Sequence, residues 1–120
     1  MTGMKKRVLV VEDDGLVREM TALVLEAAGY ETVGAEDGFE ALNILGSDPG
    51  FLAVISDMNM PDITGMELML QVHETLPNLP FIILTGENNK DVIQSILSQG
   101  AKMCIIKDEN FDNEILKALE

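Results

Sequence analysis

The chain has 120 residues, of which 47% are hydrophobic, and it carries a formal net charge of −13. This length predicts a single domain, and the apolar content excludes a disordered chain despite the charge. The acidity argues against direct binding of a nucleic acid, because counterion release requires clusters of basic residues that the sequence lacks.

The sequence predicts neither a membrane span nor a disulfide. No apolar run approaches the roughly 20 residues of a transmembrane helix, and the segment Met1–Lys6 is too short and too polar for a signal peptide. The chain has one cysteine, Cys104, so it can form no intrachain disulfide. We therefore expect a cytoplasmic protein with no membrane partner.

Apolar segments alternate with stretches of helical spacing along the whole chain. The apolar segments predict strands at 8–11, 31–35, 52–56, 81–84 and 103–106. The core-facing helix residues that we predict, helix by helix, are Leu16, Met20, Leu23, Val24 and Ala27; Phe39, Ala41, Leu42 and Leu45; Met66, Met69, Leu70 and His73, widened by Leu68 and Val72; Val92, Ile93, Ile96 and Leu97; and Phe111, Ile115, Leu116 and Leu119. Gly29 and Gly100 are expected to end the first and fourth helices.

Five such strand–helix units are typical of a parallel sheet that is covered by helices on both faces. In an open sheet of this kind, ligands bind beyond the carboxyl ends of the strands. The polar residues that end the strands are Glu12, Asp13, Asp57, Thr85 and Lys107. All of them are therefore expected at one edge of the sheet.

Three carboxylates close together repel one another and favour a bound cation. Mg²⁺ prefers oxygen ligands and often combines one or two carboxylates with a phosphate. A lysine and a hydroxyl at neighbouring strand ends suit the remaining phosphoryl oxygens. The set of side chains thus favours phosphoryl transfer to a carboxylate nucleophile.

Four motifs occur in order at this spacing, and together they carry a specific resemblance. They are Val10-Val11-Glu12-Asp13-Asp14, the segment from Asp57 to Leu68, Leu84-Thr85-Gly86, and Ile105-Ile106-Lys107. Over nearly its whole length, the chain resembles a response-regulator receiver domain of two-component signalling.

The resemblance implies a flavodoxin-like (βα)5 doubly wound parallel sheet with strand order 2-1-3-4-5, and one receiver domain over residues 1–120 without an output domain. It implies that Asp57 accepts a phosphoryl group from a phosphohistidine on a histidine kinase or a histidine phosphotransfer protein. The resulting conformational change would control a downstream protein or output domain. Such a protein is a switch rather than an enzyme, and at most assists its own phosphorylation and dephosphorylation.

The resemblance also assigns roles at the site. Asp13 and Asp57 would bind Mg²⁺ together with the backbone carbonyl of Asn59, and Glu12 would act mainly through water. Lys107 would contact one phosphoryl oxygen, and the Thr85 hydroxyl would move in to bind another. The roles are completed by the backbone N–H groups of Met58 and Gly86, which would line the phosphoryl site.

Two positions depart from the family pattern. Cys104 stands where receiver domains usually carry an aromatic residue, and Asp108 replaces the usual proline after the lysine. Asp108 either points to solvent or competes for Lys107. With this aromatic residue missing, the hypothesis is that the switch relies on Thr85 and the movement of its loop.

Several residues also have plain structural interpretations. Asp14 is better explained as a helix N-cap than as a metal ligand, and Cys104 as a small core residue rather than a redox sensor. His73 is expected to be structural or solvated.

Two other functions stay open at this point. The first is a receiver-like module that binds proteins without phosphorylation, which the departures at Cys104 and Asp108 permit. The second is a small Mg²⁺-dependent phosphatase.

Overall fold

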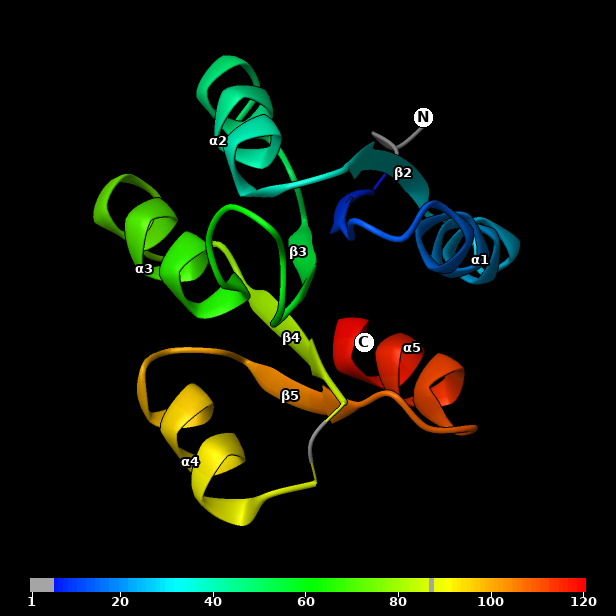
Figure 1. The fold of residues 1–120 in the computed structure, drawn as a ribbon. Helices are drawn as coiled ribbons and strands as arrows, with labels where there is room; N and C mark the ends of the chain where they lie inside the picture. Colours follow the sequence, from blue (N-terminus) through cyan, green and yellow to red (C-terminus); the bar gives the residue numbers. More distant parts are fainter. Residues whose placement is uncertain (1–5, 87) are drawn as a thin grey trace.

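The computed structural model describes residues 6–86 and 88–120, in which five strands alternate with five helices (Figure 1). The elements are β1 Arg7–Val11, α1 Gly15–Ala27, β2 Glu31–Ala35, α2 Gly38–Ser47, β3 Ala53–Asp57, α3 Gly65–Thr75, β4 Phe81–Thr85, α4 Lys90–Ser98, β5 Met103–Ile106 and α5 Phe111–Leu119.

The strands form one sheet in the order β2-β1-β3-β4-β5, and every neighbouring pair is parallel. This arrangement confirms the expected doubly wound topology. The strand order reverses direction between β1 and β3, so the open edge beyond these two strands is the place where a ligand is expected.

Helices cover both faces of the sheet. Successive residues of a strand point to opposite faces, so the apolar strands present side chains to the helices on each side. Val8 and Val10 of β1 belong to a core that includes Leu25 of α1 and Ile115 of α5. Leu9 and Val11 face the other core, to which α2, α3 and α4 contribute their buried side chains. Figure 1 shows α1 and α5 together on one side of the sheet.

Short polar side chains begin most of the helices. The side chains of Asp14, Asp37, Thr64 and Asn89 accept hydrogen bonds from backbone N–H groups at the starts of α1, α2, α3 and α4. These groups have no partner within their helix, so each cap fixes where its helix starts. Positive φ angles of 97° at Gly29 and 122° at Gly100 confirm the predicted ends of α1 and α4.

The third strand lies one residue later than the sequence predicted. It runs from Ala53 to Asp57, and Leu52 is 37% exposed outside it. Asp57 is therefore the last residue of a fully buried strand rather than the first residue of the loop. This placement holds the Asp57 backbone in the sheet.

The predicted core face of α1 is wrong. Leu16, Met20 and Leu23 are 67%, 53% and 58% exposed, whereas Thr21 and Leu25 are buried. Thr21 can be buried because its hydroxyl donates a hydrogen bond to the backbone carbonyl of Val17 at 2.8 Å. The apolar pattern of α1 thus describes a surface stripe.

The other helices depart less from prediction. Leu45, Met69, Ile96 and Ile115 are buried as expected. Phe39, Leu70 and Leu97, which were also assigned to the core, are exposed. Within the described residues, no helix combines the length and apolarity required to cross a bilayer.

Candidate functional site

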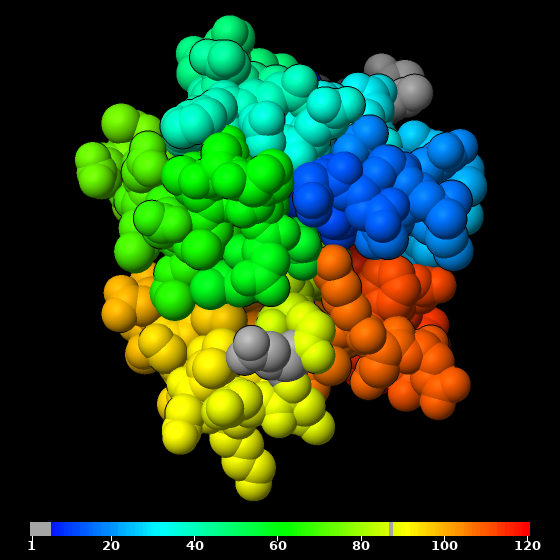
Figure 2. All heavy atoms as spheres, in the orientation of Figure 1, coloured from blue at the N-terminus to red at the C-terminus, as the bar shows by residue number. Residues whose placement is uncertain are grey.

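The register of the sheet gathers the polar strand ends. Val11 of β1 is level with Ser56, Asp57 is level with Leu84, and Thr85 is level with Ile106. Glu12, Asp57, Thr85 and Lys107 consequently follow one another across the open edge. Figure 2 shows the loops after β1, β3, β4 and β5 meeting on one face of the molecule.

Three carboxylates converge at this edge. Glu12, Asp13 and Asp57 each offer an oxygen atom, and these atoms lie within 4.8 Å of one another. Glu12 and Asp57 are 3% and 7% exposed, whereas Asp13 is open to solvent. Two buried carboxyl groups and one exposed carboxyl group thus form a cluster of oxygen atoms at the open edge of the sheet.

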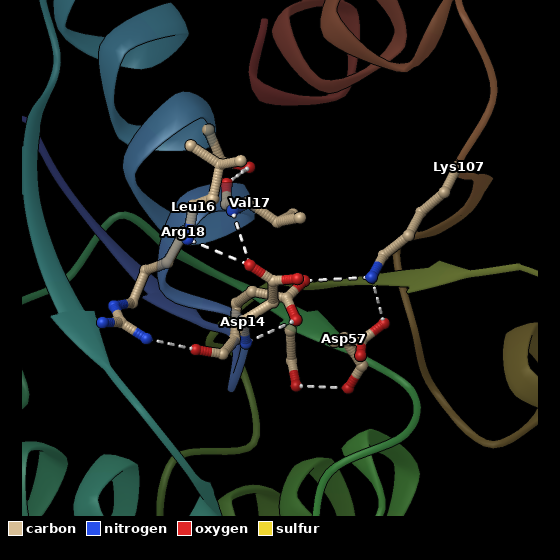
Figure 3. A network of polar contacts seen from close by, with 9 residues as sticks. Asp14, Leu16, Val17, Arg18, Asp57 and Lys107 are labelled. Atoms are coloured by element: carbon tan, nitrogen blue, oxygen red, sulfur yellow. Dashed lines mark hydrogen bonds and ion pairs between the residues drawn. The ribbon is translucent and has the colours of Figure 1, made fainter.

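Lys107 joins two of these carboxylates (Figure 3). Its Nζ lies 2.7 Å from Oδ1 of Asp57 and 3.0 Å from Oε1 of Glu12. Lys107 thus contacts two of the three carboxyl groups, and one ammonium balances only part of the negative charge that three carboxylates carry. A divalent cation would compensate that charge, and a donor set made of oxygens suits a hard ion such as Mg²⁺.

Burial and pairing shift the pKa values of two of these groups. Burial raises the pKa of Glu12 above its usual value, and the nearby Asp57 carboxylate adds to the rise, although Lys107 opposes it. Burial alone would lower the pKa of Lys107, but its hydrogen bonds to Asp57 and Glu12 outweigh that effect and raise it. Lys107 is therefore held in its charged form.

The acidic turn after β1 is fixed from two sides. The Asp14 carboxylate accepts hydrogen bonds from the N–H groups of Leu16 and Val17, which confirms its role as the N-cap of α1. Nη1 of Arg18 donates to the backbone carbonyl of Glu12 at 2.7 Å (Figure 3). These contacts hold the peptide between Glu12 and Asp13 in place.

The end of β3 packs tightly against the start of α3. The N–H of Gly65 donates to the carbonyl of Met58 at 2.8 Å, and the Ser56 hydroxyl donates to the carbonyl of Asp57 at 2.9 Å. We expected the N–H of Met58 to line the phosphoryl site, but it donates to the carbonyl of Leu84 at 2.8 Å. The reason is that this bond closes the last pair of the β3–β4 register, Asp57 with Leu84.

Thr85 is buried, whereas Asn59 is exposed to solvent. Thr85 is 1% exposed at the end of β4, and its backbone carbonyl accepts a hydrogen bond from the N–H of Lys107 at 2.8 Å. Asn59 is exposed in the loop between β3 and α3. The β4–β5 pairing thus fixes the backbone of Lys107 beside Thr85.

The departures from the family pattern have simple structural settings. The Asp108 carboxylate is exposed and accepts a hydrogen bond from the N–H of Asn110 at 2.9 Å. The Lys107 ammonium turns instead to Asp57 and Glu12. Cys104 is partly buried against the core, where burial raises the pKa of its thiol.

His73 has a structural role, as expected. Its Nε2 lies 2.9 Å from the carbonyl of Leu79, and its ring packs edge-on against Phe81.

Sequence reasoning missed three residues that support the site. These are Arg18, whose partner is a backbone carbonyl; Gly65, whose missing Cβ allows the close approach to β3; and Asp62, whose carboxylate reaches the start of α2. Arg18 lies four residues after the acidic motif, which was the one local signal. The partners of Asp62 are 24 and 23 positions away, so no local pattern could reveal them.

Comparisons with known proteins agree with this geometry. Residues 8–120 match the family model described as response regulator receiver domain. The two-component response regulator ORR11 of rice, Oryza sativa subsp. indica, is 33% identical over 107 residues, which are 88% of this chain and 73% of the rice protein.

Two solved structures are similar throughout. The chemotaxis protein CheY4 of Vibrio cholerae has a TM-score of 0.87 and 34% identity, with 97% of each chain covered. The response regulator TrrA of Thermotoga maritima, solved in complex with Mg²⁺ and BeF, has a TM-score of 0.83 and 33% identity, covering 96% of this chain and 99% of TrrA.

Proposed function

Because the chain belongs to the response-regulator receiver family, and is thus a phosphoacceptor module of two-component signalling, we propose that Asp57 is the residue that accepts the phosphoryl group. The observation that carries this proposal is its position: a carboxylate at the end of a buried strand, 2.7 Å from the Lys107 ammonium and inside an acidic cluster. An isolated buried carboxylate would be costly, so this setting favours a chemical role.

In the proposed reaction, a carboxylate oxygen of Asp57 attacks the phosphorus atom of a phosphohistidine on a partner protein. The phosphorus–nitrogen bond breaks as the phosphorus–oxygen bond forms, and the imidazole leaves with the electron pair. Lys107 is close enough to Asp57 to contact an oxygen of the new phosphoryl group and to balance part of its negative charge.

The proposed metal ligands are Asp13, Asp57 and the backbone carbonyl of Asn59, with Glu12 acting mainly through water. Bound Mg²⁺ would neutralise charge on the phosphoryl oxygens. The convergence of the oxygens of Glu12, Asp13 and Asp57 supports this assignment. The similar response regulator TrrA was solved in complex with Mg²⁺ and BeF, which supports Mg²⁺ as the ion.

The switch that we propose starts with Lys107. In the present state its ammonium is shared between Glu12 and Asp57. A phosphoryl group on Asp57 offers stronger acceptors, so Lys107 would leave Glu12 and the Thr85 hydroxyl would move toward the new oxygens. Thr85 precedes the loop to α4, which would therefore move with it.

The exposed stripe of α1, formed by Leu16, Met20 and Leu23, supports a place for the phosphodonor to dock. A partner histidine can reach Asp57 only if its protein covers the surface around the site. The stripe starts two residues after the acidic turn, and Met20 lines a hollow together with Lys107 and Phe111. We therefore assign it to a histidine kinase or histidine phosphotransfer protein.

The wider roles in this proposal follow the family. The chain is a switch that turns over no separate substrate, it acts in the cytoplasm, and it passes its signal to a downstream protein or output domain. The family match over residues 8–120 supports one receiver domain across the chain.

The first test is the intact mass of the protein after incubation with Mg²⁺ and acetyl phosphate. Wild type should gain one phosphoryl group that hydroxylamine removes, and Asp57→Asn should gain none. Asp13→Asn and Asp14→Asn form a matched pair of neighbouring carboxylates. Asp13→Asn should lose Mg²⁺ affinity, whereas Asp14→Asn keeps an N-cap and should behave as wild type.

The rival functions give different results. A protein that neither gains the adduct nor binds Mg²⁺ and beryllofluoride together would be a phosphorylation-independent binding module. Catalytic turnover of a phosphate ester would identify a phosphatase. A single adduct for each protein molecule, absent from Asp57→Asn, would exclude both.

A further inference from the structure

The side chain of Asp62 ties the loop between β3 and α3 to the start of α2. Its Oδ2 accepts a hydrogen bond from the N–H of Phe39 at 2.8 Å, and its Oδ1 accepts one from the N–H of Gly38 at 3.1 Å. Gly38 and Phe39 are the first two residues of α2, so their N–H groups have no partner within the helix.

The start of α2 also has a local N-cap, so Asp62 binds only the N–H groups that this cap leaves without a partner. Asp37 accepts a hydrogen bond from the N–H of Glu40 at 2.8 Å. Asp37 and Asp62 thus divide the free N–H groups between them. The carboxylate of Asp62 also lies at the positive end of the helix dipole, which favours its anionic form.

The residue after Asp62 adds an apolar contact at the same place. Gly38 is buried, and a Cβ atom on it would lie only 2.3 Å from Cγ1 of Ile63. Ile63 fills the space that the absent side chain leaves, and it packs against the core beneath α2 and α3. Figures 1 and 2 show the loop beside the start of α2.

The pKa of Asp62 fits a charged contact. Partial burial works to raise it, but the N–H groups of Phe39, Ile63 and Gly38 together bring it below its ordinary value. Asp62 is therefore an anion at neutral pH.

The loop is consequently fixed at two points. At its base, the N–H of Gly65 donates to the carbonyl of Met58 at 2.8 Å. Farther along, Asp62 and Ile63 hold it against α2. Asn59 lies on the stretch between these anchors, two residues after Asp57 at the end of β3. The position of its carbonyl therefore depends on both.

We propose that Asp62 is a positioning residue for the cation site. By holding the loop against α2, it sets where the carbonyl of Asn59 lies relative to Asp13 and Asp57. This inference rests on the proposed function, because it assumes that Asn59 contributes a ligand. Asp62 itself would contact neither the cation nor the phosphoryl group.

The test compares the Mg²⁺ affinity of Asp62→Ala, Asp62→Asn and Asp37→Ala with that of wild type by isothermal titration calorimetry. Loss of a group that orients a metal ligand typically weakens binding by tenfold or more, so Asp62→Ala should bind about tenfold more weakly. Asp62→Asn keeps one acceptor oxygen, so its Mg²⁺ affinity should lie between those of wild type and Asp62→Ala. Asp37→Ala weakens the same helix start without releasing the loop, and should bind Mg²⁺ as wild type does.

Two further readouts separate positioning from simple destabilisation. At saturating Mg²⁺, Asp62→Ala should accept a phosphoryl group from acetyl phosphate at nearly the wild-type rate, because Asp57 is intact. The amide NMR signals of residues 58–60 should shift in Asp62→Ala and stay in place in Asp37→Ala.

The inference fails if Asp62→Ala binds Mg²⁺ as tightly as wild type does, or if Asp37→Ala weakens binding equally. These outcomes leave the proposed function intact, since wild type still binds the ion. If wild type binds no Mg²⁺, the proposed function fails and the inference fails with it.

Discussion

Gly65 approaches the end of β3 so closely that a Cβ atom on it would lie 2.4 Å from the carbonyl oxygen of Asp57. That oxygen belongs to the backbone of the proposed phosphoacceptor, and a backbone atom cannot move aside as the end of a flexible side chain can. The absence of a side chain at Gly65 thus determines where Asp57 sits.

Gly65→Ala should therefore reduce both stability and phosphorylation. Overpacking of this kind costs about 1–3 kcal/mol, and the displaced Asp57 should accept phosphoryl groups more slowly from acetyl phosphate. Urea unfolding and intact mass against time measure the two effects. Gly46→Ala is the matched control, since a Cβ at Gly46 meets nothing within 4 Å. It should stabilise α2 by about 0.5–1 kcal/mol and leave phosphorylation unchanged. Equal phosphorylation rates in both variants would contradict this account.

Lys107→Gln should bind Mg²⁺ more tightly while it accepts phosphoryl groups more slowly. The ammonium competes with the cation for Asp57 and Glu12, and even at the dielectric constant of water a unit charge about 4 Å from a divalent ion changes the affinity by about thirtyfold. Isothermal titration calorimetry of wild type and Lys107→Gln with Mg²⁺ measures the affinity. Lys102→Gln removes the same charge from an exposed position and serves as the control. Weaker Mg²⁺ binding by Lys107→Gln alone would argue against competition.

Leu16→Ser and Met20→Ser should slow phosphoryl transfer from a phosphorylated histidine protein but not from acetyl phosphate. The side chains are exposed, so each change should alter stability by less than about 0.5 kcal/mol. Transfer rates from the two donors, measured on the same preparations, make the comparison. Leu70→Ser provides a control on α3, where Leu70 is 42% exposed on another part of the surface. A uniform loss with all three variants would show that the α1 stripe has no special role.

Asp48→Asn should reduce stability at neutral pH, and the loss should shrink in acid. The two oxygens of Asp48 accept hydrogen bonds from the Arg7 guanidinium, which lowers the pKa of Asp48 below its ordinary value. A lowered pKa stabilises the folded state above the unfolded pKa of about 3.9. This contribution is lost as the pH falls through the lower folded value.

Urea unfolding of wild type and Asp48→Asn between pH 7 and pH 3 measures this difference. Glu19→Gln, an exposed change of the same charge on α1, should show no comparable loss at neutral pH. A difference between wild type and Asp48→Asn that grows below pH 4 would show that the sign is wrong.

The strands and the site could be predicted because both depend on short-range patterns. Buried parallel strands are continuous apolar runs, and their carboxyl ends meet at one edge, so Glu12, Asp13, Asp57 and Lys107 could be grouped from the sequence. The contact between Lys107 and Glu12 was not foreseen, because it depends on side-chain placement across the sheet.

The face of α1 was misjudged for a different reason. Helical spacing of apolar residues does not tell whether the apolar face packs against the sheet or lies on the surface. A threonine such as Thr21 can occupy a core position because its hydroxyl donates a hydrogen bond to the backbone of its own helix. The role of Asp62 escaped prediction because its partners are distant in sequence.

The pairing of Asp57 with Leu84 determines where the chain can tolerate insertions and deletions. Side chains along a strand alternate with a period of two, so deleting one residue within β3 would turn the acceptor toward the wrong face. The exposed connection at Pro77 and Asn78 lies at the opposite edge of the sheet and carries no such constraint. Insertions there should be tolerated, which makes that connection the natural place to graft a reporter or a second module without disturbing the chemistry.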